Sequence, residues 1–123
     1  MRGPTASPEE RLPLTPAVFH ILLTLADGEM HGYAIMREVE RSTGGKVRMG
    51  PGTLYGAVKK LLANAVIEEA DGPGDNERDD ERRRYYRLTG LGVRVLNSEL
   101  SRLRQILQHA RRKKFVAPRG AAI

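Results

Sequence analysis

The chain has 123 residues, a formal net charge of +6 and a sequence pI of about 10.1. This length suits a single compact domain, and the basic balance favours an anionic partner, with nucleic acid the leading candidate beside acidic proteins and membrane surfaces. The absence of cysteine excludes disulfides, thiolate metal sites and a cysteine nucleophile.

The N-terminal quarter of the sequence predicts a flexible arm followed by a helix. Residues 1–12 mix Gly, Pro, Thr, Ser and charges without periodicity, which is typical of a mobile segment. Thr15 can cap a helix, and Pro16 suits the first helical position, where an amide hydrogen is not needed. Asp27 and Gly28 end the helical pattern, since glycine accepts a positive φ. The apolar positions at helical spacing are Val18, Ile21, Leu22 and Leu25.

Two more helices are predicted in quick succession. An amphipathic helix runs from Tyr33 to the Thr-Gly-Gly sequence at 43–45. An extended link at 47–49 and a sharp turn at 50–52 follow, and they make Thr53 the expected N-cap of a third helix. This succession indicates a helix-turn-helix.

The third helix is expected to bury one face and to expose a small, basic one. Its apolar stripe consists of Leu54, Ala57, Val58, Leu61, Leu62 and Ala65. The opposite face consists of Gly56, Lys59, Lys60 and Ala63.

The next segment predicts a β-hairpin, with strands at 66–70 and 85–88 joined by a long polar loop at 71–81. Because side chains alternate along a strand, Tyr86 and Leu88 are expected to face the core together. Three helices followed by a hairpin is the winged-helix order, in which the third helix enters the DNA major groove.

A long helix is predicted to follow, capped by Thr89 and running to about Lys114. Apolar residues alternate spacings of three and four along it, as in a coiled-coil seam. A monomer would leave these six positions exposed, so a homodimer is expected. The predicted dimer interface is Val93, Leu96, Leu100, Leu103, Leu107 and Ala110.

The predicted fold is therefore mainly α with a small β-hairpin. A winged helix-turn-helix occupies residues 13–88, and a dimerisation helix occupies 89–115. The tail at 116–123 is expected to be flexible like the N-terminal arm.

Three segments give this fold a more specific interpretation. They are His31-Gly32-Tyr33-Ala34-Ile35, Pro51-Gly52-Thr53-Leu54-Tyr55-Gly56-Ala57 and Arg84-Tyr85-Tyr86-Arg87-Leu88-Thr89. Together they resemble the PadR family of transcriptional regulators, in its shorter subgroup with a single C-terminal helix. The match spans about Leu14 to Gly92, roughly two thirds of the chain. The resemblance implies a homodimeric repressor that holds two recognition helices over a near-palindromic promoter site.

The candidate DNA contacts come from the third helix and from the wing. The alternative for Lys59 and Lys60 is an ordinary solvated helix face, and the alternative for Tyr55 is a position at the edge of the core. Thr53 is expected to act first as a cap, at a helix end that also presents free amides to phosphate. The wing arginines could instead neutralise neighbouring acids, but we favour contact with the DNA backbone. The predicted DNA-binding residues are Gly52, Thr53, Tyr55, Gly56, Lys59, Lys60, Arg82, Arg83, Arg84 and Arg87.

Two features depart from the family pattern. Ala65 stands where the family often has glycine, so Asn64 is expected to supply the positive φ before the strand. The wing loop is acidic and would repel phosphate, so DNA contact is expected at the base of the wing rather than at its tip. The acidic residues are Asp75, Glu77, Asp79, Asp80 and Glu81.

Several classes of function are excluded by what the sequence lacks. No nucleophile, base and acid stand at a workable spacing, and no Gly-Lys-Ser/Thr follows the 50–52 turn, so neither an enzyme nor a cofactor site is expected. His20, His31 and His109 lie apart from other ligands, so no metal is expected. The apolar stretch near 18–26 is shorter than the roughly 20 residues of a membrane span, and no secretory signal is present. We expect a bacterial cytoplasmic protein associated with the nucleoid.

Two further expectations concern partners. The resemblance implies a small hydrophobic effector bound near the dimer interface, and the last helix offers only Phe115 as an aromatic. The alternative function is a winged-helix module that docks an acidic protein partner through its basic face. The basic run at 111–114 is expected to complement the negative end of the last helix.

Overall fold

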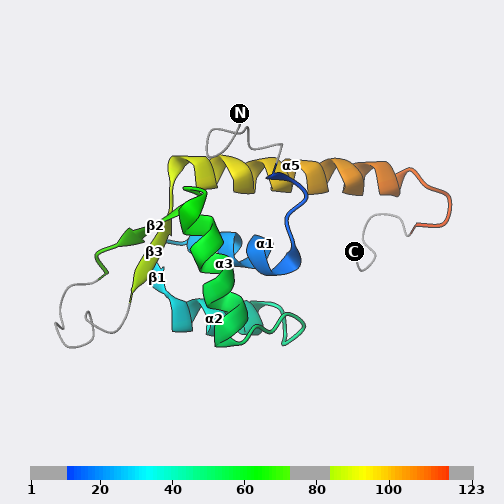
Figure 1. The fold of residues 1–123 in the computed structure, drawn as a ribbon. Coiled ribbons are helices and arrows are strands. Elements are labelled where there is room, and N and C mark those ends of the chain that lie inside the picture. The colour runs from blue at the N-terminus through cyan, green and yellow to red at the C-terminus, as the bar shows by residue number, and fades with distance from the viewer. Residues whose placement is uncertain (1–10, 73–83, 117–123) are drawn as a thin grey trace.

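The computed structural model describes residues 11–72 and 84–116. Figure 1 shows α1, α2 and α3 gathered beneath α5, with a small sheet at one side. The elements in chain order are α1 (Pro16–Leu25), β1 (Met30–His31), α2 (Gly32–Ser42), α3 (Pro51–Ala63), β2 (Ile67–Ala70), β3 (Tyr85–Leu88) and α5 (Gly90–Arg111). Most of the expected N-terminal arm and C-terminal tail, and nearly all of the acidic wing loop, lie outside the described residues.

Side-chain caps begin three of the four α-helices in the described residues. The Thr15 hydroxyl accepts the Val18 N–H at 3.2 Å, and the Thr89 hydroxyl accepts the Gly92 N–H at 3.0 Å, as predicted. His31 caps α2 in the same way, because its Nδ1 accepts the Ala34 N–H at 3.2 Å. The prediction that Thr53 caps α3 was wrong: Gly50 is the N-cap, and Pro51 is the first residue of the helix. Proline suits that position, so the helix begins before Thr53.

The turn from α3 to β2 corrects a second prediction. Asn64 has φ −95°, whereas Ala65 takes the left-handed conformation with φ 60°. The Ala65 N–H bonds the Leu62 carbonyl and the Val66 N–H bonds the Leu61 carbonyl, which is the Schellman pattern. That pattern requires positive φ at the residue after the C-cap. Asn64 is itself the C-cap, so the strained left-handed conformation falls on Ala65.

The sheet has three antiparallel strands in the order β1-β3-β2, one more than the predicted hairpin. Met30 pairs with Tyr86, and His31 pairs with Tyr85. The third strand was missed because two residues carry no readable alternation. On β3 Tyr86 is buried and Leu88 packs against the core, as the strand alternation predicts.

The hydrophobic core joins the three small helices to the first half of α5. Val95 and Leu96 of α5 are 1% and 4% exposed and belong to the same core cluster as the buried residues of α1, α2 and α3. The predicted domain division placed the end of the winged domain at residue 88, whereas the core also includes Val95 and Leu96 of α5. Gly92 packs so closely that an added Cβ would collide with the Val66 carbonyl oxygen. The start of α5 is an integral part of the winged domain.

The last helix is slightly shorter than predicted. It ends at Arg111, because the Arg112 and Lys113 N–H groups bond the carbonyls of His109 and Ala110, three residues back. Such bonds tighten and close the final turn. None of the helices in the described parts of the chain is both long and apolar enough to cross a membrane.

Candidate nucleic-acid interface

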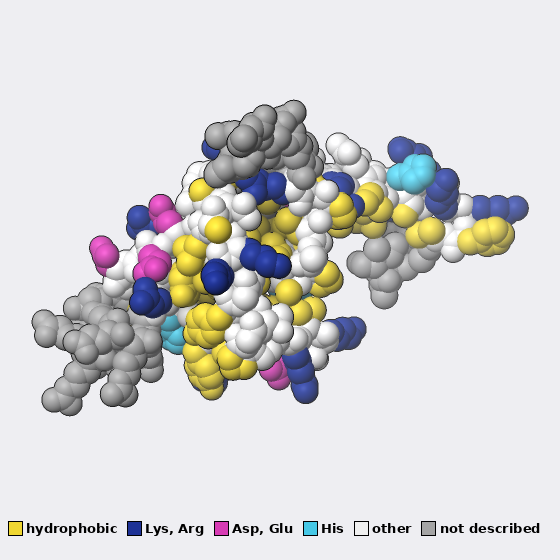
Figure 2. Space-filling model, in the orientation of Figure 1, with side chains coloured by type: hydrophobic (Ala, Val, Ile, Leu, Met, Phe, Trp, Pro, Cys, Tyr) yellow, Lys and Arg dark blue, Asp and Glu magenta, His cyan; other side chains and the backbone are white. Residues whose placement is uncertain are grey.

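The outward face of α3 is exposed, basic and free of acidic side chains. All predicted contacts on this helix are solvent-exposed, namely Gly52, Thr53, Tyr55, Gly56, Lys59 and Lys60. The sequence from Pro51 to Ala63 contains no Asp or Glu, while Leu54, Val58 and Leu61 hold the opposite face in the core. Figure 2 shows dark blue Lys or Arg side chains over this helix on a surface that is otherwise apolar or neutral.

The two glycines on this face have no role in the packing of the chain. An added Cβ at Gly52 or Gly56 would meet nothing within 4 Å, and neither residue has a positive φ. Glycine inside a helix costs roughly 0.5–1 kcal/mol relative to alanine. The fold alone therefore does not explain why glycine stands at these positions, which leave the helix backbone open to close approach from outside.

Tyr55 connects α3 to the start of α2. An added Cβ on buried Gly32 would stand 2.5 Å from the Tyr55 hydroxyl, so the tyrosine ring lies directly against this glycine. Two of the motifs that carry the family resemblance thus meet here. Tyr55 is 46% exposed. Tyr55 therefore lies at the edge of the core and also has an exposed side, so the structure is compatible with both a core-edge role and a DNA contact.

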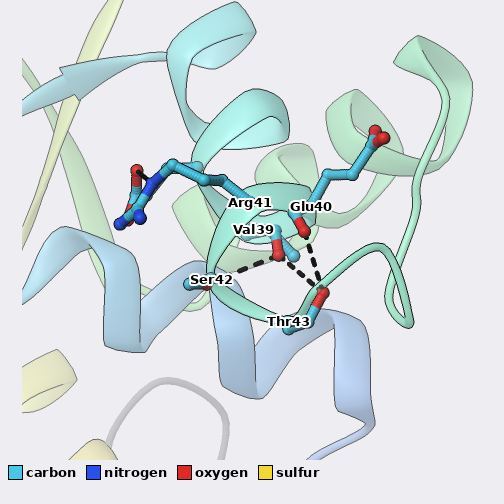
Figure 3. Close-up of polar contacts among 6 residues, drawn as sticks. Val39, Glu40, Arg41, Ser42 and Thr43 are labelled. Carbon is cyan, nitrogen blue, oxygen red and sulfur yellow. Dashed lines mark hydrogen bonds and ion pairs between the residues drawn. The ribbon is translucent and has the colours of Figure 1, made fainter.

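The turn between α2 and α3 is organised by one hydroxyl. Thr43 Oγ1 donates to the Val39 carbonyl at 2.8 Å (Figure 3). It also accepts the Val47 N–H at 3.0 Å. Gly44 and Gly45 then turn the chain with φ 62° and 81°. These contacts close the end of α2 and set the path of the chain that leads into α3.

A groove of about 550 Å³ lies along one side of α3. Gly52, Gly56 and Lys60 line one wall, and Pro13, Thr15 and Val18 line the other. The two glycines contribute no side chain to the α3 wall of this groove.

The base of the wing is electrically different from α3. Arg87 Nε lies 2.8 Å from the Glu68 carboxylate, and Arg84 Nη1 lies 3.2 Å from that of Glu69. The hydrogen bond to Glu68 raises the pKa of Arg87. Figure 2 shows acidic and basic side chains side by side over the sheet. Arg82 and Arg83 lie outside the described residues.

His31 has a structural role at the start of α2. His31 caps α2, and its ring lies edge-on to Tyr85 at a centroid distance of 5.4 Å. Across residues 11–72 and 84–116, no group of three or more His, Cys, Asp or Glu side chains could hold a metal ion.

The second half of α5 extends beyond the rest of the domain (Figure 1), and it exposes apolar side chains. Val93 and Leu103 are exposed, while Leu107 and Ala110 are partly buried. The expectation that all six seam positions face solvent was wrong: Leu96 lies in the core and Leu100 packs against it. The seam prediction also missed Ile106, which is 51% exposed.

Comparison with known proteins identifies the family. A model described as "Transcriptional regulator PadR-like family" matches residues 21–98. The chain belongs to the PadR-like family of transcriptional regulators. The family interpretation of the three sequence motifs is confirmed, and so is the prediction that the chain belongs among regulators rather than enzymes.

Individual relatives agree with this assignment. Transcriptional regulator Rv3488 of Mycobacterium tuberculosis is 34% identical over 90 residues, which cover 71% of this chain and 75% of that protein. A 37.1 kDa protein in transposon TN4556 of Streptomyces fradiae is 38% identical over 79 residues, covering 64% of this chain and 20% of that protein. The chain thus matches only about a fifth of the Streptomyces protein.

Solved structures confirm the fold. A transcriptional regulator from Clostridium thermocellum, Cth-833, has a TM-score of 0.64 and 26% identity, with 82% of this chain and 90% of that one covered. RosR of H. salinarum has a TM-score of 0.60 at 23% identity, with 84% and 83% covered. The winged helix-turn-helix predicted for this PadR-like chain is therefore correct.

Proposed function

We propose that this PadR-like regulator binds double-stranded DNA as a homodimer, inserts α3 into the major groove at each half of a near-palindromic operator, and represses transcription there. The observation that carries the proposal is the face formed by Gly52, Gly56, Lys59 and Lys60. It combines positive charge, no acid on the helix and two glycines that the fold does not need. Phosphate attracts the lysines, and a missing side chain lets the helix backbone approach the DNA.

The expected path of one DNA strand follows the groove beside α3. In winged-helix proteins the recognition helix lies in the major groove, so a sugar-phosphate strand must run along its flank. The groove between α3 and the start of α1 has Lys60 on one wall and the Thr15 region on the other. The paired arginines at the wing base would contribute less, because each must leave a glutamate to bind phosphate.

Support for the homodimer comes from one face of α5. The helical face that meets the core through Gly92 and Leu96 continues as Leu103, Ile106 and Ala110, beyond the rest of the domain. Pairing two such helices removes this apolar surface from water. In a dimer of this kind the two recognition helices would stand roughly 34 Å apart, which is one turn of DNA.

The decisive experiment measures binding by fluorescence anisotropy. Duplex from the upstream region of the protein's own gene is compared with scrambled duplex across a salt series. We expect the native fragment to bind more tightly, with affinity falling steeply between low and moderate salt because counterions are released from the DNA. Equal binding of both fragments at every salt concentration would contradict sequence-specific recognition.

A protein partner is the alternative use of the same basic face. An acidic protein would show a shallow salt dependence, since few protein interfaces release as many counterions as DNA does. Failure to bind any duplex at low salt would favour this alternative.

The dimer is tested independently by analytical ultracentrifugation. We expect the wild type to sediment as a dimer at micromolar concentration and Leu103→Asp/Ile106→Asp to sediment as a monomer, because charge at exposed apolar positions opposes pairing. The matched control, Gln105→Asp/Gln108→Asp, makes the same change in charge at exposed polar positions of α5 and should remain dimeric. A monomeric wild type would refute the dimer.

A further inference from the structure

One charged residue interrupts the apolar face of α5 where the helix leaves the domain. Glu99 is 2% exposed and follows Val95 and Leu96, which are in the core. The next positions on this face, Leu103 and Ile106, are exposed. Glu99 thus stands at the boundary between the half of α5 that belongs to the domain and the half that extends beyond it (Figure 1).

The Glu99 carboxylate connects α5 to the chain that enters α1. One oxygen, Oε2, accepts the backbone N–H of Leu14 at 3.0 Å, across 85 positions of sequence. Arg102, one turn further along α5, holds the same carboxylate with two bonds, Nε to Oε1 at 2.6 Å and Nη2 to Oε2 at 3.0 Å. Leu14 itself packs against the core. A single side chain therefore joins the projecting helix to the start of the winged domain.

Stability alone does not account for this arrangement. Burying a carboxylate is costly, and a buried ion pair is often no more stabilising than apolar side chains of similar size. The surrounding face of α5 is apolar, so leucine at this position would suit it by chemistry. Leucine would not fix the orientation of α5, because apolar contacts tolerate sliding and rotation whereas a hydrogen-bonded carboxylate has a preferred geometry. Single polar residues in apolar helix seams are known to set register in this way.

We infer that Glu99 is a positioning residue, which sets the angle at which α5 leaves the winged domain and thereby the spacing between the two recognition helices of the dimer. The inference about spacing rests on the proposed function. The angle itself is a property of one chain and can be measured without DNA.

The angle is measured as a distance within one chain. The sequence has no cysteine, so Ala63→Cys on α3 and Gln108→Cys on the projecting half of α5 introduce two unique sites for spin labels. The full-length labelled chain is mixed with an excess of unlabelled chain, so that distances between protomers do not contribute. We expect a narrow distance distribution in the wild type and one at least twice as wide in Glu99→Leu.

The matched control is Glu38→Gln. Glu38 forms the same kind of ion pair with Arg41, three residues away on α2, with an Nε to Oε1 distance of 2.9 Å, but it makes no described bond to another element. Its distance distribution should equal that of the wild type. A Glu99→Leu distribution as narrow as the wild type would overturn the inference. If Glu99→Leu does not fold, Glu99→Gln is measured instead, and a distribution as narrow as the wild type would again overturn it.

The consequence for DNA is tested with half-site spacing. Wild type and Glu99→Leu are titrated with duplexes in which the two half-sites are moved apart or together by one and two base pairs, and with a single half-site. Each base pair both shifts and rotates a half-site, so the wild type should lose about tenfold in affinity, and the variant markedly less. Equal losses in both would overturn the role in spacing. A wild type that binds no duplex would refute the proposed function, while the intrachain distances still decide whether Glu99 sets the angle.

Discussion

The outward face of α3 and the base of the wing carry the same number of described cations in very different settings. Lys59 and Lys60 stand on a helix without any acid, beside glycines that leave the surface open. Arg84 and Arg87 each face a glutamate on β2. The number of basic residues in a segment therefore does not measure the positive charge it offers to a partner. Strand register decides whether an arginine of the wing is paired with an acid, because Glu68 and Arg87 are direct cross-strand neighbours.

The wing pairs are too exposed to be explained by stability. Their side chains are about half or more exposed to solvent, and exposed ion pairs contribute about 0–1 kcal/mol. Their larger effect is on the local field, since each glutamate cancels one arginine near the phosphates that the wing would approach.

Removing the two lysines of α3 should weaken DNA binding most. We expect Lys59→Ala/Lys60→Ala to bind DNA about a hundredfold more weakly at low salt, and the slope of log affinity against log salt to fall by about two. The matched control is Arg84→Gln/Arg87→Gln, which should lose less than about tenfold, because these arginines are already neutralised. A larger loss in the wing variant would reverse the comparison. Both are measured by anisotropy.

Adding one methyl group to the α3 face should separate stability from binding. Gly56→Ala is expected to raise the free energy of unfolding by about 0.5–1 kcal/mol, because alanine favours the helix and has open space around it. DNA affinity should fall about tenfold, because the added Cβ keeps the helix from the DNA backbone. Gly90→Ala, in the first turn of α5, is the control and should leave affinity unchanged. Unaltered affinity in Gly56→Ala would refute close approach at this position.

Neutralising the wing glutamates should strengthen binding. Glu68→Gln/Glu69→Gln frees Arg84 and Arg87 for phosphate, so we expect affinity to rise a few-fold at low salt and the salt dependence to become steeper. Scrambled duplex should gain as much as the native fragment, because phosphate contacts carry no sequence information. Glu38→Gln, which frees Arg41 of α2, serves as the control. Weaker binding in the wing variant would show that the glutamates act by another route.

The buried ion pair of Glu99 and Arg102 should weaken in acid. The bonds from Arg102 hold the pKa of Glu99 below its usual value of 4.5, and the Leu14 N–H lowers it further against the opposing effect of burial. A carboxyl whose pKa is lower in the folded state stabilises the fold above about pH 4.5 and loses that contribution as the pH falls below it. In urea unfolding series from pH 7 to pH 3, Glu99→Gln should lose less stability than the wild type.

The wing provides the control for the acid effect. Glu68→Gln/Glu69→Gln removes two exposed pairs, so its stability should vary with pH as the wild type does. Equal pH dependence of Glu99→Gln and the wild type would show that the buried carboxylate is not the acid-sensitive group.

Features that depend on neighbours in sequence were predictable. The caps at Thr15 and Thr89, the apolar face of α3 and the inward position of Tyr86 follow from hydrogen bonds and periodicities within a few residues. The order of these elements, with three short motifs, was enough to identify the family. The cap of α3 and the conformation of Ala65 were local too, but each depended on where the helix begins or ends within one residue.

Other features were decided only by the tertiary structure, because they join residues that are distant in sequence. The periodicity of α5 could not show that Leu96 belongs to the core, since that depends on how far the small helices extend beneath it. Nor could it show that Glu99 bonds the Leu14 N–H or that glutamates of β2 neutralise Arg84 and Arg87. By itself the sequence determined the helices, the two hairpin strands and their order, and the buried faces of α3 and β3. Packing and strand register decided which charges face each other, because such contacts require the whole chain to be folded.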